Sequence, residues 1–238
     1  MIHGACFSDK GTREINEDCA FIKEENDRLA AVVADGLGGQ GGGNIASQIA
    51  VKHLCDFLPS DGQDELHNRF EKANEAILNN QRPGIKMMST AVALYVDNNY
   101  ALWAHMGDSR LYHFYNGKLL MQTYDHSVSQ MAVYRGDITQ DKIRFHEDRN
   151  RILRALGGDE EAREEQNCIV LDPGFHAFLL CTDGFWEYVL EKEMEDALSD
   201  APTPEEWIVK MCNLLMKKEA SEHDNFTVAA IFYAGEDR

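Results

Sequence analysis

The chain has 238 residues, of which 44% are hydrophobic and 9% aromatic. This composition can bury a sizeable core and excludes a disordered or fibrous protein. Lys+Arg 23 against Asp+Glu 41 gives a net charge of −18, which repels nucleic-acid phosphates and anionic membrane surfaces. We therefore expect neither a nucleic acid nor a membrane as a partner, and the length favours one domain over residues 1–238.

The lack of targeting signals and the spacing of the cysteines indicate a reducing compartment. No segment approaches the ~20 apolar residues that span a bilayer, and residues 1–18 lack the basic start and apolar stretch of a signal peptide. We expect a cytoplasmic monomer. The six cysteines show no C-x-x-C spacing, so free thiols are expected, with Cys6 and Cys181 buried because they lie in apolar runs.

The N-terminal part of the chain alternates short apolar runs with turns. These runs predict strands at 2–7, 19–24 and 29–34. The glycine-rich run 36–44 is expected to have no regular structure. Apolar residues at helical spacing then predict two helices, at 44–58 and 63–81.

The middle of the chain predicts an antiparallel meander, in which Asn116-Gly117 forms a tight hairpin turn. Its strands are expected at 90–96, 100–106, 110–115 and 118–123. Residues 126–157 have a helical, charged pattern that Gly136 interrupts, and strands are expected at 168–171 and 176–182. A helix capped by Thr203 and a strand at 226–233 complete the chain. Strand groups alternating with helix pairs favour an α+β sandwich with helices outside antiparallel sheets.

Two apolar strands end in the same way, with an aspartate followed by a glycine: "AAVVADG" (30–36) and "FLLCTDG" (178–184). A single Asp-Gly is an ordinary turn. Here, however, buried strands hold Asp35 and Asp183, and the glycine allows a backbone carbonyl or an ion to approach closely. Asp18 and Asp224 lie beside two further apolar runs. Acidity alone also serves solubility, but four carboxylates held by core strands predict a site for hard cations.

Carboxylates brought this close repel one another unless a cation neutralises them, and oxygen ligands favour Mg²⁺ or Mn²⁺ over zinc. Two such ions about 4 Å apart can activate a water and hold a phosphoryl group for attack. The pattern therefore predicts a phosphate hydrolase. Arg13, five residues before Asp18, is a candidate for binding the substrate phosphate through two hydrogen bonds, although a surface position is equally ordinary for an arginine.

Competing motifs lack support. Residues 36–41 match G-x-G-x-x-G, but Asp35 would repel a pyrophosphate at the loop entrance, and no second strand ending in an acid follows about 20 residues later. The sequence contains no G-x-x-x-x-G-K-[ST], no G-x-S-x-G, no C-x-x-x-x-x-R and no H-E-x-x-H. Dinucleotide binding and covalent serine or cysteine catalysis therefore lose their usual signatures.

Eight sequence blocks, in order along almost the whole chain, resemble the metal-dependent serine/threonine protein phosphatases of type 2C in their compact bacterial form. The blocks are "GTREINED" (11–18), "VVADGLGG" (32–39), "STAVALYV" (89–96), "AHMGDSRLYHF" (104–114), "DHS" (125–127), "RNRILRALG" (149–157), "LLCTDGFWEYV" (179–189) and "HDNFTVAAI" (223–231). Any single block is weak evidence, whereas eight in order are specific.

The resemblance implies a four-layer α-β-β-α sandwich of two mainly antiparallel sheets, with metal ions in a cleft at one end. The ligands that it implies for two Mn²⁺ or Mg²⁺ ions are Asp18, Asp35, Asp183, Asp224 and the carbonyl of Gly36. Asp108 would join Asp183 at a third, weaker ion, and Arg13 would bind the phosphate. Arg13, Asp18, Asp35 and Asp183 are therefore the expected catalytic residues.

The expected reaction is hydrolysis of phosphoserine and phosphothreonine on proteins, the products of a serine/threonine kinase, by a metal-bridged hydroxide without a covalent phosphoenzyme. The stretch 128–150 is expected to pack near the cleft as a mobile flap. His126 is one candidate for the general acid, although we expect a structural role for it. Two alternatives stay open: a catalytically silent module that binds phosphoproteins or senses metal, and an acidic calcium-binding interaction protein.

The sequence also departs from the family pattern. Gln40 and Asn44 stand where many bacterial members carry histidine and glutamate, and "STA" (89–91) replaces the commoner Gly-Thr-Thr. We expect none of these differences to touch a metal ligand. They leave the dynamics of the glycine loop and the choice of substrate open.

Overall fold

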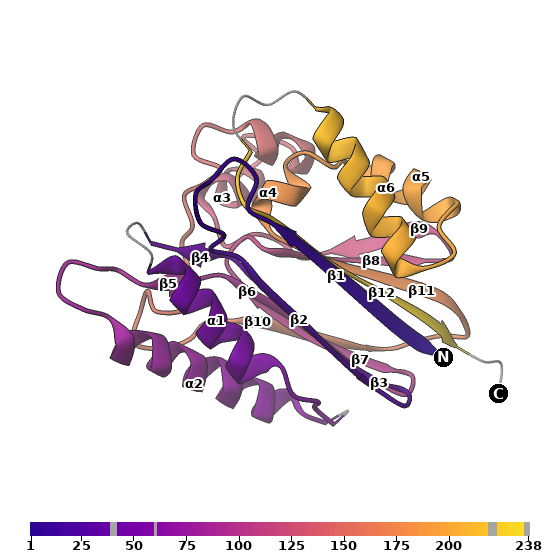
Figure 1. The fold of residues 1–238 in the computed structure, drawn as a ribbon, viewed down its shortest axis with the longest axis horizontal. Helices are drawn as coiled ribbons and strands as arrows, with labels where there is room; N and C mark the ends of the chain where they lie inside the picture. Colours follow the sequence, from indigo (N-terminus) through magenta and orange to yellow (C-terminus); the bar gives the residue numbers. More distant parts are fainter. Residues whose placement is uncertain (39–41, 60, 219–222, 236–238) are drawn as a thin grey trace.

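The structure is a computed structural model that describes residues 1–238 except 39–41, 60, 219–222 and 236–238. Two five-stranded sheets lie face to face at its centre, and helices cover both outer faces (Figure 1). The expected α+β sandwich of four layers is confirmed. Gln40, one of the departures in the glycine loop, lies outside the described residues.

Every strand pair in the two sheets is antiparallel. The first sheet has the order β1 (Ile2–Asp9), β12 (Phe226–Gly235), β11 (Gly174–Cys181), β8 (Arg110–Tyr115) and β9 (Lys118–Gln122). The second has the order β10 (Glu165–Val170), β7 (Tyr100–Met106), β6 (Ala91–Asp97), β3 (Arg28–Ala34) and β2 (Cys19–Glu25). A short pair, β4 (Gly36–Leu37) and β5 (Met88–Ser89), lies beside them.

Four longer helices form the outer layers (Figure 1). The second sheet is covered by α1 (Gly43–Leu54) and α2 (Gln63–Asn80), and the first by α5 (Glu191–Ser199) and α6 (Pro204–Lys217). Two shorter helices, α3 (Val128–Tyr134) and α4 (Asp183–Trp186), and a 3₁₀ helix (Gln140–Phe145) complete the described elements. No helix in the described part of the chain is long and apolar enough to cross a membrane.

Strand β3 shows why the central strands are almost continuously apolar. Leu29, Ala31 and Val33 pack between the two sheets, whereas Ala30 and Val32 pack on the other face against the helical layer. All five side chains are fully buried. A strand covered on both faces needs apolar residues at every position, and alternation with polar residues is lost.

The register of the strands brings five chain segments to one end of the sandwich. Cys19 pairs with Ala34, so the start of β2 and the end of β3 coincide. Cys181 pairs with both Val228 and Arg110, which places the end of β11 beside the starts of β12 and β8. Every predicted acidic ligand flanks one of these strand ends.

The predicted meander is wrong, because β6 and β7 belong to the second sheet whereas β8 and β9 belong to the first. The chain crosses between the sheets at Gly107–Ser109. A short connection between two apolar runs fits either a hairpin or such a crossing, and periodicity within the runs does not distinguish them. The hairpin at Asn116-Gly117 is confirmed, with φ values of 47° and 79°.

Smaller differences concern ends and thiols. Gly36 and Leu37 form β4 instead of irregular chain, and α1 ends at Leu54, not at 58. Helix α5 was not expected. All six cysteines are free, but Cys6 is exposed whereas Cys181 is buried, because the outer face of β1 is only partly covered.

Candidate metal and phosphate site

A pocket of about 590 Å³ lies where the two sheets present their acidic strand ends. Residues from both sheets and from two loops line it, among them Arg13, Glu17, Asp35, Gly36, Asp108, Asn150, Ile152, Asp183, Asp224 and Asn225. Asp18 does not line the pocket, but its carboxylate interacts electrostatically with those of Asp183 and Asp224. The structure therefore places all seven predicted site residues at one end of the sandwich.

Asp35 follows β3 and is held through its backbone. Its N–H donates to Thr90 Oγ1 at 2.9 Å, and its carbonyl accepts from Thr90 N at 2.8 Å and from Ser89 Oγ at 3.0 Å. The expectation that the "STA" segment touches no predicted ligand is therefore wrong. Ser89 ends β5 and Thr90 directly precedes β6, and the sequence pattern there does not reveal which hydroxyl meets a neighbouring strand end, so sequence reasoning missed this contact.

The two Asp-Gly pairs have a common packing reason. A Cβ atom at Gly36 would lie 2.1 Å from the carbonyl oxygen of Gly43, and one at Gly184 would lie 2.1 Å from that of Asn225. Backbone approaches this close leave no room for any side chain. The glycines thus let α1 and the start of β12 close on the strand ends that carry Asp35 and Asp183, which agrees with the close carbonyl approach expected from the sequence.

Asp18 lies just before β2, where Thr182 Oγ1 donates to its Oδ2 at 2.9 Å. Burial, reinforced by the nearby Asp183 carboxylate, raises the pKa of Asp18 to about 7. Burial also raises the pKa of Asp183, with Asp224 as the next contributor. Both carboxyl groups therefore hold their protons unusually tightly in the metal-free protein.

Asp35 and Asp108 face the same conflict between burial and charge. Burial raises the pKa of Asp35 far above its ordinary value, and the neighbouring Asp18 and Asp183 carboxylates raise it further. Burial, followed by Asp183 and Asp125, does the same to the pKa of Asp108. Each carboxylate in this cluster opposes the ionisation of the next, and a bound cation would relieve that opposition.

The donor set fits Mn²⁺ or Mg²⁺. Oδ1 of Asp18 and Oδ1 of Asp108 are buried, and neither has a hydrogen-bond partner among the described residues. Buried carboxylate oxygens are normally paired, and an orphan costs free energy. All the predicted ligand atoms are oxygens, which hard divalent cations prefer. Divalent cations would both pair the orphaned oxygens and neutralise the cluster.

Arg13 lies at the rim of this pocket. Its Nη2 donates to Asp224 Oδ2 at 2.8 Å, and the side chains are 60% and 45% exposed. An ion pair this exposed is worth ~1 kcal/mol at most, so the guanidinium can exchange partners.

Asn225 fixes the loop that carries Arg13 and was not predicted. Its side-chain amide donates to the carbonyls of Lys10 at 2.9 Å and Ile15 at 3.0 Å, and its Oδ1 accepts from Glu17 N at 2.8 Å. This side chain ties the 10–17 loop to the segment that carries Asp224. The only available signal was its place in the "HDN" block.

The expected flap, 128–150, contains α3, the 3₁₀ helix and a bend at Gly136, where φ is +78°. It starts beside the pocket, because Val128 N donates to the carbonyl of Arg151 and Ile152 lines the pocket. The structure thus places the start of the segment, at Val128, and its end, at Asn150, beside the site. That the segment moves stays a prediction.

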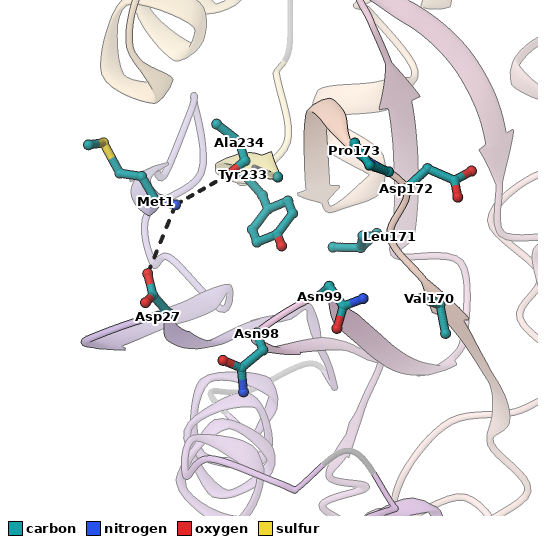
Figure 2. Close-up of a pocket in the computed structure, with 11 residues that line it drawn as sticks. Met1, Asp27, Asn98, Asn99, Val170, Leu171, Asp172, Pro173, Tyr233 and Ala234 are labelled. Atoms are coloured by element: carbon teal, nitrogen blue, oxygen red, sulfur yellow. Dashed lines mark hydrogen bonds and ion pairs between the residues drawn. The ribbon is translucent and has the colours of Figure 1, made fainter. Parts of the chain in front are cut away.

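A second pocket, of about 420 Å³, lies near the N-terminus, at the opposite ends of the strands (Figure 2). Its polar groups already serve the fold: the Met1 ammonium donates to the carbonyl of Ala234 at 3.2 Å and lies 3.9 Å from Asp27 Oδ1. None of the predicted site residues lines it. The acidic pocket is therefore the candidate functional site.

Comparison with known proteins agrees with this geometry. A family model described as Protein phosphatase 2C matches residues 10–224, which is most of the chain. The chain belongs to the protein phosphatase 2C family. The resemblance seen in the eight sequence blocks is thus confirmed.

Relatives within the family cover nearly the full length. The "Serine/threonine phosphatase stp" of Listeria welshimeri is 30% identical over 99% of this chain and 92% of its own. The crystal structure of the Mycobacterium tuberculosis serine/threonine phosphatase PstP/Ppp superposes with a TM-score of 0.85 at 29% identity and covers 99% of each chain. A structure of the PstP catalytic domain with two manganese ions gives a TM-score of 0.82 at 29% identity, over 97% of each chain.

Proposed function

We propose that this protein phosphatase removes phosphate from phosphoserine and phosphothreonine in proteins, using divalent cations held by the acidic strand ends. The observation that carries the proposal is the convergence of four strand-held carboxylates whose pKa values are all raised: Asp18, Asp35, Asp108 and Asp183. Such an array disfavours its own ionisation unless cations bind, so its persistence in a folded pocket is best explained by metal binding.

The residues proposed to hold two core Mn²⁺ or Mg²⁺ ions are Asp18, Asp35, Asp183, Asp224 and the Gly36 carbonyl. Asp108, whose pKa the nearby Asp183 carboxylate helps to raise, is proposed to hold a third, weaker ion. Bound in this way, the ions would lower the pKa of a water molecule and neutralise the phosphoryl oxygens. In support, the PstP structure in this family is described as a complex with two manganese ions.

The protein side chains supply orientation. Arg13 presents a planar guanidinium at the rim of the pocket, and we propose that it donates two parallel hydrogen bonds to the substrate phosphate. Asp224, which Arg13 contacts at 2.8 Å, would then be released for a cation. This exchange would bring the phosphate beside the acidic cluster.

The lining of the pocket argues against a covalent phosphoenzyme on a hydroxyl, thiol or imidazole. None of the described residues that line it is a serine, threonine, cysteine or histidine. We propose that the nucleophile is water, with the lining carboxylates engaged in holding cations. Burial and the nearby ring of His105 lower the pKa of His126 to about 3, so this imidazole is neutral at pH 7 and does not fit the general-acid role.

The broader setting follows from the sequence expectations. We propose that the substrates are proteins phosphorylated by a serine/threonine kinase, that the enzyme is a cytoplasmic monomer, and that residues 1–238 form one catalytic unit with 128–150 as its flap. The high negative charge of the chain supports phosphoproteins with basic residues near the phosphate over nucleic acids.

The test is phosphate release from a phosphothreonine peptide by metal-stripped protein. We expect no turnover in EDTA, recovery with Mn²⁺, and loss in Asp183→Asn. The exposed Asp159→Asn, away from the pocket, is the matched control and should keep full activity. Binding of the phosphopeptide without turnover at any Mn²⁺ concentration would establish the silent module, and a response to Ca²⁺ but not Mn²⁺ would establish the calcium-binding protein.

A further inference from the structure

His126 connects the crossing between the sheets with the wall of the pocket. Its backbone N–H donates to the carbonyl of Gly107 at 2.9 Å, and its Nδ1 accepts from Gly107 N at 3.2 Å. Its own carbonyl accepts from Leu153 N at 2.7 Å. One residue therefore holds both peptide groups of Gly107, which directly precedes Asp108, and also holds the 149–156 segment.

The crossing at Gly107 is tightly packed on its other side as well. Gly107 has φ +105°, and a Cβ atom there would lie 2.6 Å from the Thr90 side chain. The neighbouring groups are fixed as well: Trp186 Nε1 donates to the carbonyl of Asp108 at 2.9 Å, and Ser109 Oγ lies 2.6 Å from Thr90 Oγ1. Three consecutive residues of the crossing are thus held by side chains from other elements, and at their centre Asp108 Oδ1 is buried with no hydrogen-bond partner in the described part of the chain.

A metal ion at His126 is the competing explanation. Among the described residues, His105, His126 and Glu165 offer ligand atoms within 4.8 Å of one another. However, the two imidazole rings are stacked, with centroids 4.7 Å apart and planes inclined by only 14°. The ring lone pairs lie in the ring planes, so two stacked rings do not direct them at one ion.

The hydrogen bonds of His126 also oppose metal binding. Because Nδ1 accepts from Gly107 N, the neutral ring carries its proton on Nε2. Nε2 lies 3.5 Å from Arg154 Nη1 and 3.7 Å from Glu165 Oε2. A cation at Nε2 would have to displace this proton and approach the positively charged Arg154 guanidinium, so both the hydrogen bonding and the local charge disfavour a metal there.

We propose that His126 is a positioning residue: its ring holds the Gly107 N–H and its backbone N–H holds the Gly107 carbonyl, so that the Asp108 carboxylate is preorganised for the third, weaker cation. The proposal rests on the role given to Asp108 in the proposed function. It adds that the affinity of this one site depends on an imidazole that touches no cation itself. Through Leu153, the same residue also links Asp108 to the pocket wall at Ile152.

The test measures Mn²⁺ binding to the metal-stripped protein by calorimetry. In His126→Ala the Gly107 N–H loses its acceptor, and we expect the weakest Mn²⁺ step to loosen by about 10-fold or more, as for other residues that orient a ligand. The tighter steps should not change. His126→Asn places an amide oxygen near the position of Nδ1 and should restore most of the affinity. Asp108→Asn should abolish the same step.

His113→Asn is the matched control, because His113 is fully buried in β8 and its Nε2 lies 2.9 Å from His176 Nδ1. It should leave all Mn²⁺ steps unchanged. Equal loosening in His126→Ala, His126→Asn and His113→Asn would mean general loss of packing and would overturn the inference. If Asp108→Asn abolishes the weakest step but His126→Ala leaves it unchanged, the inference about His126 is overturned and the proposed function stands.

Two further outcomes separate this inference from the proposed function. If Asp108→Asn leaves every step unchanged, the role of Asp108 is wrong and the inference falls with it. If the wild-type protein binds no Mn²⁺, the proposed function itself fails. Titration with Zn²⁺ covers the competing explanation, since a stoichiometric Zn²⁺ site that disappears in both His126→Ala and His105→Ala would make His126 a ligand.

Discussion

Replacing Asp18 by asparagine should stabilise the metal-free protein. Burial and the nearby Asp183 raise the pKa of Asp18 from its ordinary 3.8 to about 7. A carboxyl group whose pKa is higher in the folded state favours folding in its protonated form, and this contribution is lost as the pH rises from below 4 to above 7. Asparagine keeps an acceptor for Thr182 Oγ1, which lies 2.9 Å from Asp18 Oδ2, but carries no charge.

The size of the effect follows from the shift. A difference of about three pKa units corresponds to about 4 kcal/mol at most at pH 8, and to about 2 kcal/mol at pH 5, where the group is largely protonated in the folded state. Asp18→Asn should therefore raise the free energy of unfolding in EDTA by up to these amounts. Added Mn²⁺ should reverse the order, because binding stabilises only the protein that keeps its ligands.

The assay is urea-induced unfolding at pH 5 and pH 8, in EDTA and in Mn²⁺, with the exposed Asp159→Asn as control. The control should follow the wild-type protein under all four conditions. A gain of the same size at both pH values would show that charge is not the cause. An Asp18→Asn variant less stable than wild type at pH 8 in EDTA would refute the argument that the acidic cluster destabilises the metal-free fold.

Three further changes probe the same site. Arg13→Ala should raise KM more than it lowers kcat in steady-state kinetics with a phosphopeptide. Arg13→Lys should restore only part of the loss, because an ammonium cannot form the paired hydrogen bonds; an unchanged KM would show that Arg13 is only a surface residue. Thr90→Val removes the hydroxyl bonded to Asp35 N and Ser109 Oγ, and should cost about 1–3 kcal/mol in urea unfolding, whereas an unaltered unfolding curve would contradict this. Exchanging 128–150 for the same segment of a relative should change which phosphopeptides are hydrolysed without changing Mn²⁺ binding, and an unchanged ranking over a peptide panel would exclude the segment as a specificity element.

Much of the site could be predicted from the sequence because its acids are attached to strong local signals. Asp35 and Asp183 end long apolar runs, and each is followed by a glycine that packing requires. A continuous apolar run identifies a strand covered on both faces, and the aspartate at its end is then placed at the edge of the sheet. The strand register then brings these aspartates together, since antiparallel neighbours place the start of one strand beside the end of the next.

The features that were missed depend on contacts between distant segments. Nothing within "LWAHMGDSRLY" tells that the chain leaves one sheet for the other at Gly107. Likewise, the contact of Thr90 with Asp35 and the ties from Asn225 to the 10–17 loop join residues more than 50 positions apart. Such side-chain hydrogen bonds have no periodicity, so a single sequence does not reveal them.

Anomalous scattering at the manganese absorption edge, from crystals grown with Mn²⁺, tests the central claim most directly. The proposed function predicts two strong peaks among Asp18, Asp35, Asp183, Asp224 and the Gly36 carbonyl, with a weaker third peak beside Asp108. The strong peaks should be lost in crystals of Asp35→Asn. Manganese bound elsewhere, with no peak among the acidic strand ends, would contradict the account.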